Sequence, residues 1–196
     1  MSLESGTVPA TFKHAVITPL LIKPNLDPDL MNNYGPISNL SFVSKLLERD
    51  VAVQLRQHID NNDLLNIFQS AHRQHHSTET ALVRIQNDHL ISVDKKKGVL
   101  TVLLDMSTAF NTVDHTMLIG QMRNIGIEGT ALKWLESYIS NRTHTVRIGS
   151  HNSHRTLIES GIPHGSVLGP VLFSILYDAI GCYLQKISTS IPYLCR

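Results

Sequence analysis

The sequence contains little cysteine, with only Cys182 and Cys195 among its 196 residues. Two cysteines cannot form the disulfide framework of a small secreted domain. The first residues, MSLESGTVPA, also lack the basic and then apolar pattern of a secretory signal peptide. We therefore expect a protein with free thiols in the cytoplasm or the nucleus.

Long apolar runs and an excess of one charge are missing as well. The longest apolar stretch, VLGPVLFSILY, is too short to span a bilayer and is interrupted by Gly169 and Pro170. The net charge is +1 with His neutral, whereas proteins that bind polyanions usually carry a clear basic excess. The composition therefore predicts no membrane partner, and by itself it does not indicate nucleic acid.

The apolar pattern predicts a mixed α+β fold in two parts. Ala15–Ile22 reads as a strand. Helices and one β-hairpin follow, and we expect the helices at Asn39–Ile59, Ser77–Leu90, from His115, at Thr130–Ile139 and from Pro170, and the hairpin at Thr143–Pro163. Leu82 is expected on the buried side of the second helix. The composition changes near residue 98 from polar and looped to apolar, so we place a boundary there between segments 1–98 and 99–196.

One carboxylate stands at the end of the most apolar predicted strand. The run VLTVLLD, residues 99–105, ends in Asp105, and small residues and Phe110 follow it. A strand end is rigid and accessible to solvent, which suits a carboxylate that binds a metal or a phosphate. A cap of the following turn explains Asp105 equally well. The aspartate motif of haloacid-dehalogenase-like phosphatases needs a second acid two residues further on. This sequence has Ser107 there, which removes the general acid and argues against a phosphatase of this class.

Three further segments carry candidate functional residues, each with a second explanation. Ser160–Phe173, SGIPHGSVLGPVLF, has three glycines that allow a ligand to approach the backbone closely, or that simply form a turn. Asn141–Arg155 has three arginines and three histidines without an acid, as in a hairpin that faces phosphate or only solvent. His72, His75 and His76 have the spacing of metal ligands on a helix, but they precede the predicted helix and have no acidic or cysteine partner near them, so we predict no metal site there.

Taken in order, these segments resemble the reverse transcriptase domain of non-LTR, LINE-type retrotransposons. The resemblance is carried by TFKHAVITPLLIKPNLDP with NNYGPISNLSFVSKLLE, QSAHRQHHSTETALVRIQND, LLDMSTAFNTVDH, GTALKWLESYISNRTHTVRIG and GIPHGSVLGPVLFSI. LLDMSTAFNTVDH resembles polymerase motif A, and GIPHGSVLGPVLFSI resembles motif B. The resemblance covers nearly the whole chain and implies a partial right-hand polymerase fold, with a fingers-like segment at 1–98 and an incomplete palm at 99–196.

The resemblance also implies a chemistry. It is RNA-directed DNA polymerisation by two-metal nucleotidyl transfer, with Mg²⁺ as cofactor and an RNA template, a DNA primer and deoxynucleoside triphosphates as partners. Asp105 would be the catalytic metal ligand of motif A, with the carbonyl of Met106 beside it, and Phe110 falls at the position that blocks a ribose 2′-OH. We expect nucleotide contacts at Phe110, His164, Gly165, Ser166 and Lys23, and nucleic-acid contacts at Arg142 and Arg147 of the basic hairpin.

The sequence departs from the usual form of these motifs at several positions. Gly35 stands where the fingers motif usually has arginine, His164 where motif B has glutamine, and Asn111 where motif A has a second aspartate. The last residues, SIPYLCR, resemble the approach to motif C, but no acidic residue follows Asp178 and both motif C aspartates are absent. We therefore expect these 196 residues to be catalytically inactive by themselves. A non-catalytic nucleic-acid-binding module and an active polymerase within a longer product are the alternatives.

Overall fold

The computed structural model describes residues 2–103 and 109–187, with side chains through Asp178. It has the mixed α+β character that the sequence predicts. The helices are α1 (Ser2–Ser5), α2 (Phe42–Asn61), α3 (Thr78–Asp94), α4 (His115–Asn124), α5 (Gly129–Ile139) and α6 (Gly169–Ile187). The strands are β1 (His14–Leu21), β2 (Tyr34–Asn39), β3 (Arg142–Ile148), β4 (His151–Asn152) and β5 (Thr156–Ile158). No helix in the described part of the chain is both long and apolar enough to cross a bilayer.

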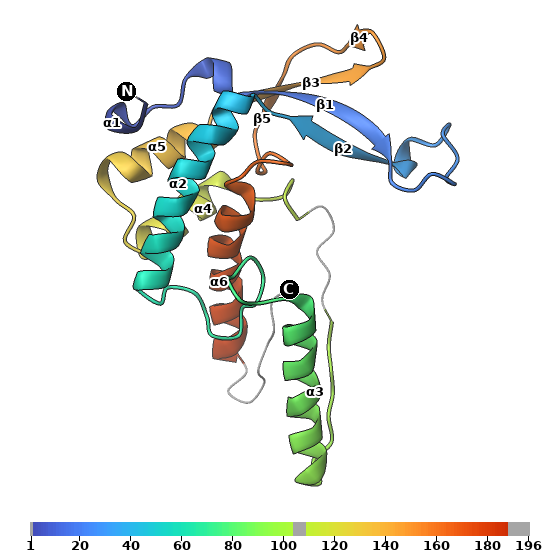
Figure 1. The fold of residues 1–196 in the computed structure, drawn as a ribbon, viewed down its shortest axis with the longest axis vertical. Coiled ribbons are helices and arrows are strands. Elements are labelled where there is room, and N and C mark those ends of the chain that lie inside the picture. Colours follow the sequence, from blue (N-terminus) through green and yellow to red (C-terminus); the bar gives the residue numbers. More distant parts are fainter. Residues whose placement is uncertain (1, 104–108, 188–196) are drawn as a thin grey trace.

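A sheet in the order β2-β1-β3-β4 forms one end of the molecule, with β5 also paired to β3 (Figure 1). β1 pairs antiparallel with β2 and parallel with β3, so Val16 lies opposite Asn39 on one side and Thr145 on the other. Segments far apart in the sequence therefore form one sheet. The sequence does not predict β2, because Gly35 and Pro36 are turn formers. Pro36 is tolerated there because β2 is the edge strand of the described sheet.

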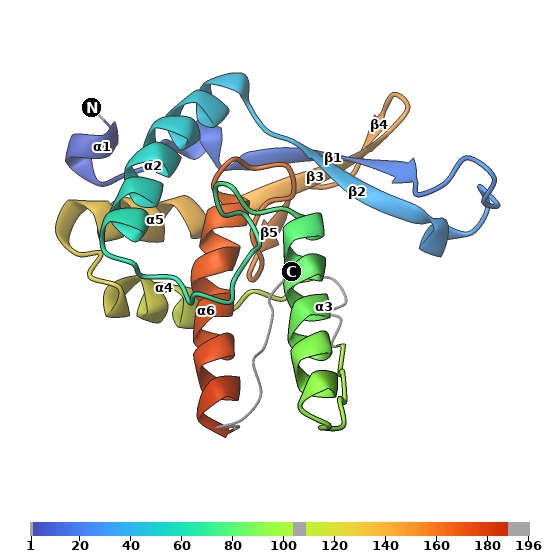
Figure 2. The ribbon, with the colours of Figure 1, turned by 60° about the horizontal axis from the view of Figure 1, so that its bottom comes forward.

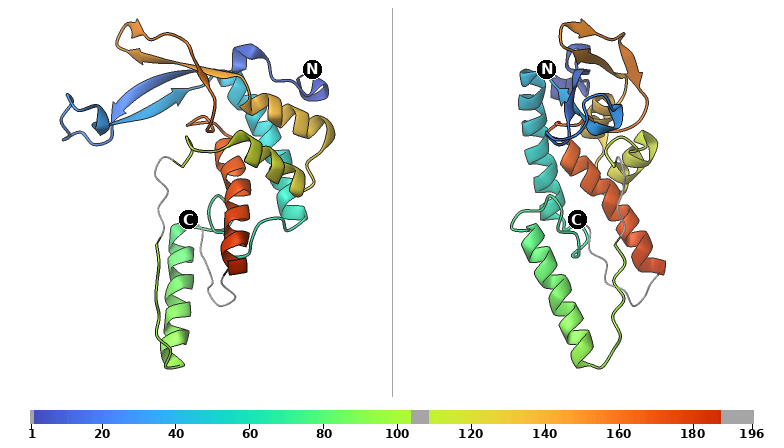
Figure 3. Two further views of the ribbon diagram at one scale, coloured as in Figure 1. Left: turned by 180° about the vertical axis from the view of Figure 1, so that it is seen from behind. Right: turned by 90° about the vertical axis from the view of Figure 1, so that its right-hand side faces the viewer.

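The hydrophobic core lies where α2, α4, α5 and α6 meet (Figures 1 and 3). Leu118 and Met122 of α4 and Leu172 of α6 are completely buried, as the spacing of apolar residues predicts. Trp134 and Tyr138 of α5 are almost fully buried and stack with ring centroids 5.6 Å apart. Trp134 is therefore a core residue and not a surface on which a ligand stacks.

The helix α3 extends beyond this core, to the lower end of the molecule in Figure 1, and Figure 2 shows it running in nearly the same direction as α6. Its start is fixed by two reciprocal hydrogen bonds, in which Ser77 Oγ accepts from Thr80 N and Thr80 Oγ1 accepts from Ser77 N. The predicted helix cap at Ser77 is thus confirmed. Ala81 is the buried residue of α3. Leu82 is 59% exposed, and its predicted burial is wrong because the described chain covers little of this helix.

The apolar segment that leads to Asp105 does not form the predicted buried strand. Residues 99–103 run beside α3 and pair with no described strand (Figure 3), and Leu100 and Leu103 are each 87% exposed. An apolar run becomes a buried strand only where neighbouring elements cover it. The segment contacts α3 through a side-chain hydrogen bond of 2.9 Å between Thr101 Oγ1 and His89 Nε2.

Candidate functional site

The two loops that resemble polymerase motifs A and B meet in the structure. Ile162 N donates a hydrogen bond of 2.8 Å to Phe110 O, and Gly161 N donates one of 2.8 Å to Val113 O. The ring Nε2 of His115 forms a third bond, also 2.8 Å long, with Gly161 O. The loop before α4 and the loop before α6 are thereby joined at three points, and we call this contact the loop junction.

Gly161 makes this close approach possible. Its φ is +90°, a left-handed value that favours glycine. A Cβ atom here would lie 2.9 Å from Asn111 Cα and 2.9 Å from the carbonyl oxygens of Asn111 and Phe110. These are backbone atoms that cannot rotate away, so any side chain at this position would separate the two loops.

The side chains of Phe110 and His164 contact each other at the loop junction. Their ring centroids are 5.6 Å apart and their planes are tilted by 54°. Phe110 also stacks on Phe173 of α6 at 4.8 Å, and His164 Nε2 donates to Asn111 Oδ1 at 2.8 Å. An amide oxygen only accepts, so Nε2 is the donor of this bond. Both rings are half-buried, which leaves them fixed in position but accessible to a ligand.

Glu48 of α2 is a buried carboxylate, only 1% exposed, that holds the loop before α6 in position. Its carboxylate accepts from Val167 N at 2.7 Å and from Leu168 N at 3.4 Å. Ser44 Oγ, one turn earlier on α2, donates to the same carboxylate at 3.1 Å. The N–H groups that lead into α6 are therefore bound by the protein's own carboxylate.

Gly165 and Ser166 differ in what they can offer a ligand. Gly165 is exposed, and a Cβ atom there would lie 3.3 Å from Ser38 O of β2. Ser166 is buried, and its Oγ accepts from Gly169 N at 3.0 Å. Gly165 thus presents open backbone at the surface, whereas the hydroxyl of Ser166 already has a partner at the start of α6.

The position of Glu48 on its helix indicates that it is buried, although Glu48 belongs to none of the recognised motif residues. Glu48 lies on the same side of α2 as Ala52, Leu55 and Ile59, at the spacing of one, two and three turns, and all three are buried. A carboxylate within a buried apolar stripe needs hydrogen-bond donors, because an unpaired buried charge is strongly unfavourable. Its position predicts a bonded core residue, but the sequence does not say which donors it meets.

Arg142 lies in the core, which corrects its expected role in nucleic-acid binding. It is 1% exposed, donates from Nη1 to Tyr138 O at 3.0 Å, and stacks over the Tyr138 ring at 4.9 Å. Burial lowers the pKa of Arg142, while Tyr138 and Glu48 act to raise it. The guanidinium thus bonds to backbone carbonyls in the core, Tyr138 O and Phe12 O, and is not accessible to a phosphate. Arg147, in the same strand, is exposed.

Lys23 is not brought to the loop junction. It is exposed in the turn after β1. The part of the sheet that approaches Gly165 is Ser38, which pairs with Ile17 of β1. Lys23 lies two residues beyond the end of β1, and the strand from Ile17 to Leu21 alone spans about 13 Å. The role of Lys23 as a triphosphate contact stays a prediction.

The predicted metal ligands, Asp105 and Met106, lie outside the described residues, and their roles stay predictions. Within the described residues, no group of three or more His, Cys, Asp or Glu side chains could hold a metal ion. Asp114 has another role, since its Oδ1 accepts from Met117 N at 2.8 Å as the cap of α4. A complete Mg²⁺ site is therefore not formed by the described residues alone.

Comparison with known proteins decides the family. Residues 22–194 match the family model described as reverse transcriptase (RNA-dependent DNA polymerase). The chain belongs to the reverse transcriptase family. The matched range of this reverse transcriptase chain includes both loops that meet at Gly161.

The relatives come from non-LTR retrotransposons, as the motifs predict. The chain is 33% identical over 174 residues to the probable RNA-directed DNA polymerase from transposon BS of Drosophila melanogaster, covering 89% of this chain and 19% of that protein. It is 30% identical over 173 residues to the RNA-directed DNA polymerase from mobile element jockey of the same species, covering 88% and 19%. It is also 28% identical over 189 residues to a retrovirus-related Pol polyprotein from the type-1 retrotransposable element R2 of Popillia japonica, covering 95% and 26%. This reverse transcriptase chain thus spans about a fifth to a quarter of the length of these relatives.

Proposed function

We propose that the chain forms the fingers and part of the palm of an RNA-directed DNA polymerase. The observation that supports this most is the loop junction, where the motif A and motif B loops are joined by backbone hydrogen bonds. Nucleotidyl transfer needs the metal ligands and the nucleotide-facing residues at one place. The proposed substrates are deoxynucleoside triphosphates, with an RNA template and a DNA primer as partners.

Each residue at the loop junction has a proposed role. Phe110 excludes a ribose 2′-OH by occupying the space beside the sugar, and His164 limits the movement of that ring by contact. Gly165 allows the nucleotide and its template base to approach the backbone closely. Asp105 and the carbonyl of Met106 are the proposed ligands of Mg²⁺, which supplies electrostatic stabilisation to the transferring phosphoryl group when it is bound.

Replacing Phe110 with alanine is expected to remove discrimination against ribonucleotides. We expect radiolabelled dTTP to crosslink under ultraviolet light to the chain bound to a poly(rA)–oligo(dT) hybrid. Unlabelled dUTP should compete about tenfold better than UTP, which differs only in its 2′-OH. In Phe110→Ala the two competitors should become equal, because the ring no longer occupies the position of the hydroxyl. Phe68→Ala, which truncates another half-buried phenylalanine, should keep the preference, and equal competition in the parent chain would contradict the role of Phe110.

The 196 residues by themselves are expected to bind the hybrid without extending its primer. They supply one carboxylate, Asp105, to the proposed metal site, whereas Mg²⁺ in such sites relies on more than one carboxylate together with the substrate phosphates. Primer extension with Mg²⁺ should give no incorporation above a protein-free blank, while fluorescence anisotropy detects the bound hybrid. Nucleotide incorporation by the parent chain that disappears in Asp105→Ala would contradict the prediction that these residues are inactive by themselves. Absence of hybrid binding at low salt would overturn the nucleic-acid part of the proposal.

A nucleic-acid-binding role without catalysis is the second candidate, and the exposed hairpin favours it. Arg147, His151, His154 and Arg155 are all exposed, and the hairpin residues 141–155 include no acid. Arginine side chains gathered on one edge attract phosphate without regard to sequence. This candidate differs from the polymerase proposal in one outcome, since the hybrid would bind but dTTP would not crosslink.

A further inference from the structure

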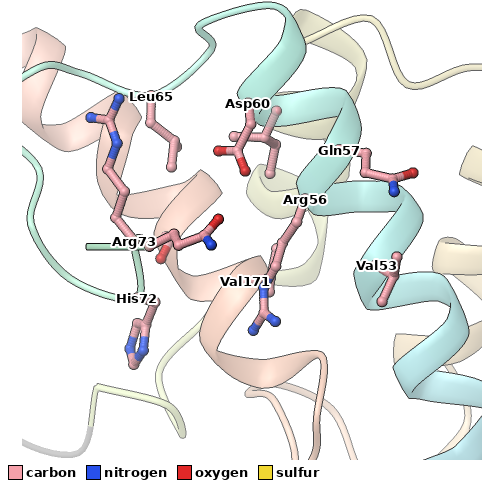
Figure 4. A pocket seen from close by; sticks show the side chains of 11 residues that line it. Val53, Arg56, Gln57, Asp60, Leu65, His72, Arg73 and Val171 are labelled. Atoms are coloured by element: carbon pink, nitrogen blue, oxygen red, sulfur yellow. The ribbon is translucent and has the colours of Figure 1, made fainter. Parts of the chain in front are cut away.

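An open cleft of about 480 Å³ lies between α2, α6 and the segment before α3 (Figure 4). Arg56 of α2 lines it from one side, and His72 and Arg73 of the segment line it from the other. Asp60 is the single acid among the lining residues. The cleft therefore carries an excess of groups that can be cationic, although the chain as a whole is close to neutral.

The side chains that matter most are Arg56 and His72. Arg56 extends from α2 toward the side of the hollow on which His72 lies, while the Asp60 carboxylate lies at the other end (Figure 4). Burial, and then the charge of Arg56, lower the pKa of His72, which agrees with their proximity. Among the described residues, none forms an ion pair or accepts a hydrogen bond from the Arg56 guanidinium. An anion between these two side chains would supply the missing partner.

The charge of the cleft continues along α2. Lys45, Arg49 and Arg56 lie on one side of this helix, because their separations of four and seven residues are close to whole turns. Arg49 and Arg56 are exposed and Lys45 is half-buried. From Lys45 to Arg56 the helix rises about 17 Å. Such a row is longer than one phosphate group and fits a ligand with several phosphates along its length.

The cleft is separate from the loop junction. Val171 and Ser174 of α6 line the cleft, whereas Phe173 and Tyr177 form the aromatic contacts that lead to Phe110. At 100° per residue, Val171 lies about 160° around α6 from Phe173, the residue that stacks on Phe110, so the cleft and this stack lie on different sides of the helix. A ligand in the cleft would therefore contact α6 without occupying the surface of Phe110 and His164.

We propose that the cleft binds a backbone phosphate of a single-stranded nucleic acid between Arg56 and His72, and that the strand continues along the basic side of α2. This inference rests on the proposed function, because it takes the template strand as the natural source of such a ligand. The cleft then positions the strand outside the loop junction, and its contacts are independent of base sequence.

The test is the binding of a labelled single-stranded RNA to the full chain, followed by fluorescence anisotropy over a range of NaCl concentrations. Arg56→Gln should weaken binding about three- to tenfold and reduce the slope of log K against log salt by about 0.7, the value for one phosphate contact on a single strand. Arg56→Lys should retain the slope. Arg123→Gln is the matched control, since Arg123 is a 60% exposed arginine of α4, and it should leave both the affinity and the slope unchanged.

Three outcomes would overturn the inference. They are no RNA binding by the full chain, an Arg56→Gln variant with the affinity and slope of the parent, and displacement of the RNA by polyglutamate as effective as that by poly(A). Equal thermal unfolding of the parent and Arg56→Gln shows that the variant is folded, as expected for an exposed side chain. The polymerase proposal is decided separately by nucleotide crosslinking. RNA binding that depends on Arg56 without dTTP crosslinking would support the cleft and reject the nucleotide site.

Discussion

Glu48→Ala is expected to lower the free energy of unfolding by about 3 kcal/mol, the loss typical of a buried hydrogen-bonded charge. The substitution leaves Val167 N and Leu168 N without their acceptor. It also removes the carboxylate that favours the charged form of the buried Arg142. Urea denaturation of the parent and the variant, followed by circular dichroism, measures the difference.

Two further variants separate the role of this carboxylate from a general effect of mutation. Glu48→Gln keeps an oxygen acceptor of the same shape and should lose less stability than Glu48→Ala. Asp50→Ala removes an exposed carboxylate from the same helix and should change the stability by less than about 0.5 kcal/mol. A Glu48→Ala variant as stable as Asp50→Ala would contradict the positioning role of Glu48.

Gly161→Ala should destabilise the chain by about 3 kcal/mol and separate the motif A and motif B loops. Two effects add, because alanine is strained at a φ of +90° and its Cβ atom would meet backbone atoms at 2.9 Å. The same variant should lose the proposed dTTP crosslink, since Phe110 and His164 would no longer face one ligand. Thermal unfolding and crosslinking of the same sample give both results.

The matched control for this substitution is Gly120→Ala. Gly120 lies within α4, and a Cβ atom there meets nothing within 4 Å. Alanine should therefore raise the stability by about 0.5–1 kcal/mol through its higher helix propensity. If Gly161→Ala had the same midpoint of thermal unfolding as the parent chain, the close approach of the loops would not depend on this glycine.

These two residues have complementary effects on the same loop. Gly161 permits the approach to the motif A loop, and Glu48 binds the backbone that continues into α6. Glu48 belongs to a helix in the fingers-like segment, whereas the loop belongs to the part that resembles the palm. The boundary near residue 98 stays a prediction, but one hydrogen-bonded carboxylate joins elements on both sides of it.

The residues of the candidate site differ in how well the sequence predicts them. The resemblance to motifs A and B selects Phe110 and His164, which the structure places 5.6 Å apart. It does not select Glu48, because the donors of that carboxylate lie in a loop far along the chain. Motif residues are recognised by their order, whereas a hydrogen bond between distant segments leaves no local pattern.

Local patterns along the chain predict the helices α2 to α6 and the cap of α3, whereas α1 is not predicted. Ser77 predicts the start of α3 because its partner is three residues away, and the spacing of Leu118 and Met122 gives the inner side of α4. Burial is different, because it depends on what packs against a surface. Arg142 and Arg147 are five residues apart in β3 and so face opposite sides, but only packing against α5 makes the first a core residue.

The apolar residues 99–103 show the opposite case, in which apolar side chains are exposed although their sequence predicts burial. Their hydropathy predicts a buried strand, and yet Leu100 and Leu103 are exposed because no described element covers them. The hydrophobic effect stabilises a residue only when a neighbour removes its surface from water. Short stretches of sequence thus determine whether a segment forms a helix or a strand. Contacts between segments far apart in the chain determine which of its side chains are buried.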